Sequence, residues 1–586
     1  MPNRLEAYFI KPLYPYSIWS NRPTNVTMLN MILRNVIADI LEQATQNAQK
    51  DGALPRASQI DVTVERPQSR DHGDFATSLP LKLAKSMRMN PVDIATQIVR
   101  FIVPQNPLKD VWIEAPGFIN FSLSPEWLST QVQKILDEAE LFGNIPLGNE
   151  EQIQVEFVSV NPTGPIHVGH ARGAVLGDTL ANILEAASYQ VTREYYFNDA
   201  GNQMINFYAS LFARYKQSLG EQESMPESGY MGQYMIDMAA KLSAIHGDKF
   251  LPNQSEDGKQ KLGQIGLDLM LMGIKDNLNR LRVNFDVWFK EHTLFEQGQY
   301  DKAINSLRDG GYLVIRDGAT WLSSTALGED KDNVLIRGNG MPTYFAADIA
   351  YHYNKFLERE FSRVINIWGA DHQGHISRMK TAIQALGVEP DRLTIITHQM
   401  IAVKSNGQSL RASKRTGDII TLEEILDEVG ADACRYFFLA RSPESQMEFD
   451  LNLAKKESSE NPVYYIQYAH ARTASILQLA RDNNIDYTDG DVSLLTDPAE
   501  QSLVNKMLTL PELIESMAKN LEPHHMPHFS QELATSFHWF YQQCRVISSD
   551  NEDLEITKAR LKLVEASGNV LRKCLSLMGM TAPVSM

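Results

Sequence analysis

Apolar residues recur at helical spacing in three places within the first hundred residues. The first pattern predicts a helix over residues 29–48. Its repeating positions are Ile32, Val36, Ile40 and Leu41. A second helix is expected over residues 79–87. A third should follow Asn90, a candidate N-cap, because Pro91 then occupies the first helical position.

Short apolar runs around these helices predict strands at residues 60–64 and 112–114, and another in the stretch APGFINFSLS. This mixture of helices and strands indicates an α+β domain over residues 28–125. The stretch PEWLSTQVQKILDEAELFG predicts a helical linker, assigned to residues 126–150. Residues 1–27 are rich in aromatic residues and proline, and we interpret them as a flexible extension.

A different pattern begins at Ile153, where apolar and polar residues alternate as in a strand. After a turn rich in glycine and proline, apolar residues from Val168 to Ala187 mark one face of a helix, and QVTREYYF predicts the next strand. A strand, a helix and a second strand in this order form a βαβ unit with parallel strands. The domain that this unit begins is assigned to residues 151–455.

The parallel sheet is expected to resume at VINIWGADHQGH, and LTIITHQMIAV predicts a further strand. Residues 198–342 are interpreted as an insertion, with a helix at 262–281 and a hairpin that turns at Asp317-Gly318. Residues 456–586 show helical patterns with few strand signals. The expected fold is a multidomain α/β architecture, in which a Rossmann-like parallel-sheet domain lies between an N-terminal α+β domain and a C-terminal all-α helical bundle.

The composition is that of an ordinary globular protein, with 43% hydrophobic and 22% charged residues. No apolar run reaches about 18 residues, so no membrane span is expected. The three cysteines lie far apart, which favours a reducing, cytoplasmic location and argues against a disulfide framework or a cysteine-based metal site. A net charge of −17 is mild evidence against nucleic-acid binding, although it does not exclude a local basic face.

The stretch VSVNPTGPIHVGHARGAVLGD, residues 158–178, joins a parallel strand to a helix at the edge where such sheets bind ligands. The free N–H groups of a helix N-terminus suit a phosphate, and Gly164 and Gly169 let the backbone approach one closely. His167 and His170 are three residues apart, so both can donate to phosphate oxygens from one side of the first turn. A histidine pair that only caps the helix is the alternative, and the residue types alone do not decide between the two.

The segment from His167 to His170, HVGH, resembles the HIGH signature of class I aminoacyl-tRNA synthetases. Those enzymes carry a second signature, KMSK, after the last strand of the sheet, and RASK at residues 411–414 is similar to it in that place. Arg411 and Ala412 depart from the signature, whereas Ser413 and Lys414 match it. Four cations between residues 404 and 415, with no acidic residue among them, make a local basic patch suited to polyphosphate.

Further stretches resemble arginyl-tRNA synthetases in particular. They are NPTGPIHVGHARGAVLGD, REYYFNDAGNQ, GDFATSLPLKLAK, GADACRYFFLAR and NPVYYIQYAHAR. Cys434 departs from the D-A-L-R element of the family. The resemblance, which extends from about residue 30 to the end, implies an arginine–tRNA ligase. Such an enzyme forms arginyl-adenylate from L-arginine and ATP, releases pyrophosphate and transfers arginine to the 2′-hydroxyl of the terminal adenosine of tRNA.

The resemblance also implies roles for individual residues. The expected catalytic residues are His167, His170 and Lys414. The expected site for ATP, bound with Mg²⁺, comprises Asn161, Pro162, Thr163, Gly164, Pro165, His167, Gly169, His170, Asp371, Arg411, Ser413 and Lys414. The expected arginine site comprises Asn161, Glu291, Tyr344, Asp348 and Gln373. Asp348 is the first choice as partner of the guanidinium, and it shares a helix face with Tyr344.

The N-terminal domain resembles the family module that contacts the tRNA D-loop, and the C-terminal bundle resembles the anticodon-binding domain. The candidate tRNA contacts are Tyr464, Tyr468, His470 and Arg472. The family requires bound tRNA before it activates arginine, and a monomer is expected. No protein-bound metal is expected, because the histidines of PHHMPH, residues 523–528, are interpreted as a loop before a helix.

Two other classes of protein could carry such motifs. The first is another class I synthetase or a small adenylyltransferase, and the family-specific stretches argue against it. The second is a non-enzymatic RNA-binding relative that has kept the fold. The presence of His167, His170, Asp348 and Lys414 argues against this class, because a degraded copy would have lost some of them.

Overall fold

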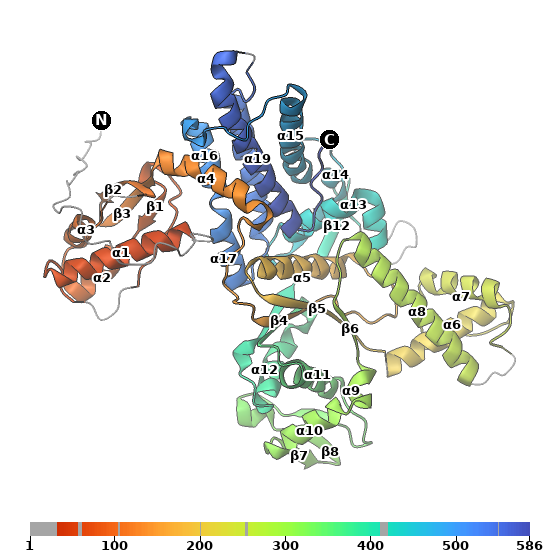
Figure 1. Cartoon of the computed structure of the whole chain (residues 1–586). Coiled ribbons are helices and arrows are strands. Elements are labelled where there is room, and N and C mark those ends of the chain that lie inside the picture. Colours follow the sequence, from red (N-terminus) through yellow and green to blue (C-terminus); the bar gives the residue numbers. More distant parts are fainter. Residues whose placement is uncertain are drawn as a thin grey trace.

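The computed structural model describes residues 32–56, 61–103, 106–199, 201–251, 256–410, 420–548 and 550–586. Within these ranges the chain forms an N-terminal α+β domain, a central parallel sheet with helices, and a C-terminal helical bundle (Figure 1). The multidomain α/β fold expected from the sequence is therefore confirmed. Residues 1–27 lie outside the described residues, as does the loop that contains Arg411, Ala412, Ser413 and Lys414.

The N-terminal domain packs helices against a three-stranded antiparallel sheet of order β1-β3-β2. Its elements are α1 (Leu33–Lys50), β1 (Phe75–Thr77), α2 (Leu79–Met87), α3 (Pro91–Arg100), β2 (Leu108–Glu114) and β3 (Phe118–Leu123). The predicted N-cap is confirmed, because the Asn90 side chain accepts a hydrogen bond from the Val92 N–H at 2.9 Å. The strand predicted at residues 60–64 is wrong for the described residues 61–64, which are irregular; the isolated bridge there joins Glu65 to Ala76.

The core face of α1 differs from the predicted one. Leu33, Ile37 and Leu41 are buried, whereas Val36 and Ile40 are only half-buried. Apolar residues stand side by side at positions 36–37 and 40–41, so helical spacing alone permits either face. The contact with the rest of the domain selects between them.

Five parallel strands form the central sheet, in the order β11-β10-β4-β5-β6. They are β4 (Gln152–Glu156), β5 (Gln190–Phe197), β6 (Val287–Lys290), β10 (Arg363–Gly369) and β11 (Leu393–His398). The predicted βαβ unit is present as β4, α5 (Val168–Ala186) and β5, and the two strands pair directly. Because all five strands run the same way, their carboxyl ends meet at one edge of the sheet.

Helix α5 buries the apolar residues predicted between Val168 and Ala187, and it is buried on almost every other side as well. The sheet lies beneath it, and helices α13 (Leu422–Leu439), α17 (Leu510–Asn520) and α19 (Leu554–Leu577) pack against it. Glycines permit this close packing. A Cβ at Gly177 would lie 2.2 Å from the ring of Phe157, and one at Gly173 would lie 2.9 Å from His398 Nε2.

The segment 198–342 is not one insertion, because β6 returns to the sheet within it. The first insertion contains α6 (Asn202–Ser218), α7 (Gln233–His246) and α8 (Glu256–Arg280). The second contains α9 (His292–Glu296), α10 (Gln299–Asp309), β7 (Leu313–Arg316), β8 (Ala319–Leu322) and β9 (Asn333–Ile336). The predicted hairpin is confirmed as β7–β8, with positive φ at Asp317 and Gly318.

The stretch LTIITHQMIAV forms two strands in different sheets, not one. The chain leaves the central sheet after β11 and starts β12 (Ile401–Ser405) in a small sheet of order β13-β12-β14. The partners of β12 are β13 (Gln408–Leu410) and β14 (Met447–Asp450). Helix α11 (Tyr344–Tyr353) precedes β10 in the chain, and α12 (Ile376–Ala385) follows it.

The C-terminal bundle is all-helical in its described residues. Its main helices are α15 (Pro462–Asp482), α16 (Pro498–Met507), α17 (Leu510–Asn520), α18 (His525–Gln543) and α19 (Leu554–Leu577), and the short α14 (Leu451–Ala454) precedes them. The linker helix α4 (Pro125–Glu138) packs on α16 and α19. His525 and His528 belong to α18, so PHHMPH starts this helix and is not a loop before it.

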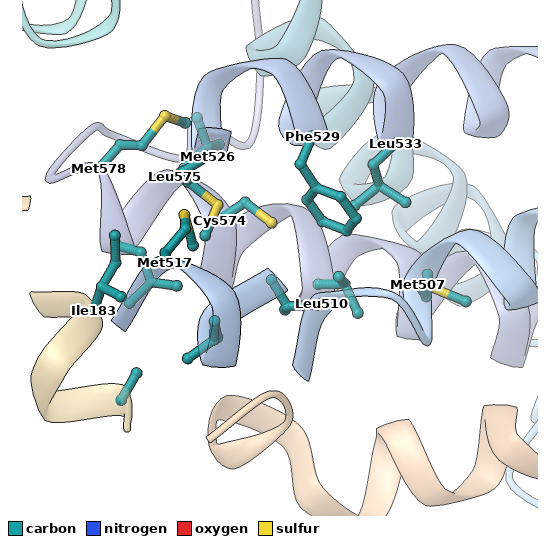
Figure 2. Packing of buried hydrophobic residues seen from close by; sticks show 14 of the residues in the cluster. Ile183, Met507, Leu510, Met517, Met526, Phe529, Leu533, Cys574, Leu575 and Met578 are labelled. Atoms are coloured by element: carbon teal, nitrogen blue, oxygen red, sulfur yellow. The ribbon is translucent and has the colours of Figure 1, made fainter. Parts of the chain in front are cut away.

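The bundle core continues into the central domain. Figure 2 shows Leu510 and Met517 of α17 and Met526 of α18 packed near Leu575 of α19, with Ile183 of α5 beside them. The N-terminal domain lies on the other side of the bundle (Figure 1). Arg66 binds both carboxylate oxygens of Glu512, at 2.9 and 3.2 Å. The three domains are therefore joined by apolar packing and by partly buried ion pairs. No helix among the described residues is long and apolar enough to span a bilayer.

Candidate active site

Most of the predicted site residues gather at the carboxyl edge of the central sheet. Residues 161–170 follow β4, Glu291 follows β6, and Asp371 and Gln373 follow β10. His398, the last residue of β11, pairs in register with Gly369 at the end of β10. An open parallel sheet binds ligands at this edge, because the loops there point away from the strand ends toward a common crevice.

A strained turn leads from β4 into the site. Val158 and Ser159 both adopt left-handed backbone angles, with φ of 68° and 42°. A β-branched residue rarely adopts this conformation, so the surrounding structure must hold it. Tyr195 donates a hydrogen bond to the Val160 carbonyl at 2.8 Å, and the Ser159 hydroxyl accepts one from the Tyr196 N–H. These bonds turn the chain out of the sheet toward Asn161.

His167 and His170 lie against each other at the start of α5, as their spacing predicts. Their ring centroids are 3.4 Å apart. His167 is the N-cap, and its Nδ1 accepts a hydrogen bond from the Gly169 N–H at 3.1 Å. The hydrogen of the neutral ring must then be on Nε2, which is the atom left to donate to a ligand. The capping and ligand-binding interpretations are thus compatible.

Both histidines are neutral at pH 7. Burial lowers the pKa of His167. The pKa of His170 falls to about 3 through burial and the proximity of His167 and His398. Nδ1 of His170 has no hydrogen-bond partner among the described residues. The pair can therefore offer hydrogen-bond donors to phosphate but no positive charge.

A third histidine, His398, belongs to this cluster and was not predicted from the sequence. It is 8% exposed, and burial lowers its pKa to about 4. Its Nδ1 also has no partner among the described residues. The neighbours of His398 in its strand are apolar or small polar residues, so the local sequence does not mark it as a site residue. The pairing of β10 with β11 brings it to the site.

Two carboxyl groups that lack a cation partner face the site from different elements. Burial, together with the neighbouring Glu291 and Glu156, raises the pKa of Asp348 to about 7, despite Arg378 and Lys355. The pKa of Glu291 is also raised, mainly by burial. A carboxylate in such surroundings gains most from a cation that arrives with the ligand.

The carboxylate of Glu291 is held by a residue that sequence reasoning missed. Tyr196 donates its hydroxyl hydrogen to Glu291 Oε2 at 2.5 Å. The Tyr196 ring stacks on Tyr351, at 4.4 Å between centroids. Burial and the acidic neighbours, Glu291 above all, keep the pKa of Tyr196 well above its usual range, so it remains a donor. Tyr196 lies in the stretch REYYFNDAGNQ, but the sequence of that stretch does not indicate that Tyr196 bonds to Glu291.

Four other charged groups near Asp348 and Glu291 form two ion pairs. Lys355, which is fully buried, donates to Glu156 Oε2 at 2.6 Å. Arg359 binds both oxygens of Glu194, at 3.0 and 2.5 Å. These four groups are neutral as pairs, so they do not compensate the negative charges of Asp348 and Glu291.

The remaining predicted arginine-site residues are more exposed. Tyr344 is 54% exposed at the start of α11, where its hydroxyl lies near the loop after β5. Asp371 and Gln373 are also exposed. The Asp371 carboxylate folds back over Gly369, since a Cβ at Gly369 would lie 2.5 Å from Asp371 Oδ1. Because the Asp371 side chain is exposed and can rotate, this contact does not by itself require glycine at position 369.

The basic patch predicted between residues 404 and 415 is described only in part. Lys404, on β12, pairs with Glu448 of the neighbouring strand β14 at 2.7 Å. The sequence shows no acid near Lys404, because Glu448 reaches it through strand pairing. Arg411, Ser413 and Lys414 lie outside the described residues.

Three of the four candidate tRNA contacts form a stripe along α15. Tyr464 and Tyr468 stack at 6.1 Å between centroids, and the Arg472 guanidinium lies over the Tyr468 ring. Tyr541 of α18 lies on the other side of Arg472. His470 faces away: it is 1% exposed and its Nδ1 lies 2.8 Å from the Pro583 carbonyl. His470 is therefore a packing residue in this structure, and the surface role expected for it is corrected.

Three family models match the chain. They are described as arginyl tRNA synthetase N terminal domain, matching residues 32–123, tRNA synthetases class I (R) catalytic domain, matching 131–437, and DALR anticodon binding domain, matching 466–586. An arginine–tRNA ligase of Dehalococcoides mccartyi is 54% identical over 556 residues, which cover 95% of this chain and 99% of that protein.

The chain belongs to the arginyl-tRNA synthetase family. The family expected from the sequence motifs is thus confirmed. A second member, an arginine–tRNA ligase of Carboxydothermus hydrogenoformans, is 45% identical over 561 residues, covering 95% of this chain and 100% of that protein. The structure of the Thermus thermophilus arginyl-tRNA synthetase has a TM-score of 0.74 with 21% identity, covering 94% of this chain and 100% of that one. At that identity it supports the fold alone.

Proposed function

We propose that this chain is an arginine–tRNA ligase that activates L-arginine with ATP and transfers it to tRNA. The observation that carries the proposal is the pair of uncompensated carboxyl groups, Asp348 and Glu291, at the same sheet edge as the neutral histidine pair. The first pair suits a guanidinium, and the second suits a polyphosphate. Close placement of both sites is what adenylation of arginine requires.

Arginine recognition follows from the charge of the pocket. Asp348 and Glu291 would bind the cationic side chain of arginine, because a planar guanidinium satisfies carboxylate oxygens in pairs. Asn161, Tyr344 and Gln373 would contact the rest of the amino acid. A neutral side chain of similar length would leave both acids without a cation partner, which is costly.

ATP, bound with Mg²⁺, would lie across the start of α5. His167 Nε2 and His170 would donate to its phosphates, and residues 161–165 would approach it with their backbone. Because both histidines are neutral, positive charge for the leaving pyrophosphate must come from elsewhere. Lys414, with Arg411 and Ser413, is the proposed source, and Asp371 the proposed contact to the ribose.

Arginine would then pass from the adenylate to the 2′-hydroxyl of the terminal adenosine of tRNA. The N-terminal domain is proposed to contact the D-loop. The stripe of Tyr464, Tyr468 and Arg472 is proposed to stack on anticodon nucleotides, because aromatic and guanidinium faces bind unpaired bases. A cytoplasmic monomer is the proposed working form.

Exchange of radioactive pyrophosphate into ATP tests the proposed function directly. We expect exchange only when arginine and tRNA are both present, because the family activates its amino acid on the tRNA-bound enzyme. Lysine and citrulline, in place of arginine, should give no exchange above background. Equal exchange with another amino acid, or none with arginine and its tRNA, would contradict the proposal.

His170→Ala should lower kcat of arginine-dependent exchange by about 10²-fold, because it removes one donor at the transferring phosphate. His525→Ala, a change of the same kind on the exposed first turn of α18, is the matched control and should leave kcat unchanged. Retention of more than about a third of wild-type kcat in His170→Ala would show that the ring only caps the helix.

A further inference from the structure

The turn of residues 161–165 carries backbone and side-chain groups of both proposed substrate sites, yet it lies outside the sheet. Strand β4 ends at Glu156, and α5 begins at Val168. Within the turn, the Thr163 N–H donates to the Asn161 carbonyl at 2.8 Å. One internal hydrogen bond does not fix five residues, so contacts from neighbouring elements must determine the geometry of the turn.

Helix α7 of the first insertion supplies one such contact. Tyr234 donates its hydroxyl hydrogen to the Thr163 carbonyl at 2.6 Å. The end of the Tyr234 ring lies directly over Gly164, where an added Cβ would be 3.5 Å from the hydroxyl oxygen and 3.6 Å from Cζ. The tyrosine therefore holds the middle of the turn by a partly buried hydrogen bond and by ring contact.

Helix α6 of the same insertion supplies a second contact, at the beginning of the turn. Gln203 Oε1 accepts a hydrogen bond from Asn161 Nδ2 at 2.6 Å. The other end of this amide, Asn161 Oδ1, accepts from the Asn198 N–H at 3.1 Å. Because both ends of the Asn161 amide are bound, its orientation toward the arginine site is determined.

The first insertion can act as one body. Its helices share a core of their own, which includes Phe207 and Leu211 of α6, Met235 of α7, and Leu262 and Leu267 of α8. The end of α8 is anchored in the main core by Ile274 and Leu278. Figure 1 shows the three helices projecting beyond the central sheet. A displacement of this body would move Tyr234 and Gln203 together.

We infer that Tyr234 and Gln203 are positioning residues through which the helical insertion sets the geometry of the 161–165 turn for adenylate formation. The inference rests on the proposed function, since it assigns a role within that reaction. Tyr234 acts on the part of the turn that approaches ATP. Gln203 acts on Asn161, which approaches arginine. Each contact should therefore affect a different substrate.

Steady-state pyrophosphate exchange with tRNA present tests this separation. Tyr234→Phe should raise KM for ATP by about 3- to 10-fold and leave KM for arginine within twofold of wild type. Gln203→Ala should raise KM for arginine by about 3-fold and leave KM for ATP within twofold. The smaller effect is expected for Gln203 because its bond to Asn161 is exposed to solvent.

Tyr208→Phe is the matched control. It removes a hydroxyl from the same insertion, where Tyr208 bonds to Gln264 and not to the turn, so both KM values should stay at wild type. Thermal unfolding and active-site titration of each variant would separate positioning from loss of fold. Unchanged KM values in Tyr234→Phe, or a fall in active fraction alone, would overturn the inference. Absence of arginine-dependent exchange in the wild type would instead contradict the proposed function.

Discussion

Replacing Asp348 with asparagine should lower kcat/KM for arginine by about 10³-fold or more, because a buried guanidinium would lose its charged partner. The pKa of Asp348 is about 7 without ligand, so the carboxyl must lose a proton before it pairs with arginine. In the wild type, KM for arginine should rise as the pH falls below about 7, approaching tenfold per unit. Exchange kinetics from pH 6 to 8.5 measure both effects.

The same variant should be more stable than the wild type in the absence of arginine. The pKa of Asp348 is about 7 in the folded chain, against its ordinary value of 3.8. Between these values the folded state holds a proton that the unfolded state has released, so stability falls as the pH rises through this window. Above about pH 7 the folded state bears the full cost of the ionised Asp348 carboxylate. Asp348→Asn should remove this cost and raise the free energy of unfolding by about 1–4 kcal/mol.

Urea unfolding at pH 8 and pH 4 measures this gain, which should be present at pH 8 and absent at pH 4. Asp330→Asn, an exposed change of the same kind, should alter neither stability nor arginine kinetics. Wild-type kcat/KM for arginine in Asp348→Asn would remove the central argument for an arginine site. If the difference in free energy of unfolding between Asp348→Asn and the wild type is the same at both pH values, Asp348 is well solvated in the folded protein.

Arg435→Met should destabilise the folded protein by about 3–5 kcal/mol, because it removes the close partner of a buried carboxylate and leaves that group only the longer contact to Arg193 at 3.8 Å. Arg435 is fully buried and binds the Asp178 carboxylate of α5. It also donates to the carbonyls of Leu281 and Met578, which lie in the region after α8 and at the end of α19. One guanidinium thus joins the central domain, its first insertion and the bundle.

A lower midpoint of urea unfolding, followed by far-ultraviolet circular dichroism, would report this loss. Arg572→Met is the matched control. Arg572 is exposed on α19 and bonds to Asn569, so its replacement should cost less than about 0.5 kcal/mol. An Arg435→Met midpoint equal to that of the control would show that the ion pair does not stabilise the domain junction.

The D-A-L-R element gains a physical meaning from these contacts. Asp432 binds Arg282 and accepts from the Thr581 N–H at 3.0 Å, while Arg435 binds Asp178. Both charged positions of the element hold the C-terminal segment onto the central domain. Cys434 lies between them and is fully buried, so at this position the requirement is an apolar side chain.

The sequence by itself determined the features that depend on neighbours along the chain. Periodicity located α2, and Asn90 with Pro91 located the start of α3. Asp317-Gly318 predicted the β7–β8 turn, and the spacing of His167 and His170 predicted that they lie on the same side of the helix start. These features are local because a cap, a tight turn or a helical face involves residues no more than about four apart.

Only the tertiary structure decided what depends on residues far apart. It placed β6 in the sheet and divided LTIITHQMIAV between two sheets, because hydrogen-bond partners elsewhere in the chain select each strand. It buried His470 and paired Lys404 with Glu448. The electrostatics of the site arise in the same way. The raised pKa of Asp348 exists only where Glu291 and Glu156 come close and the surrounding protein desolvates the carboxyl group, and no local pattern records either condition.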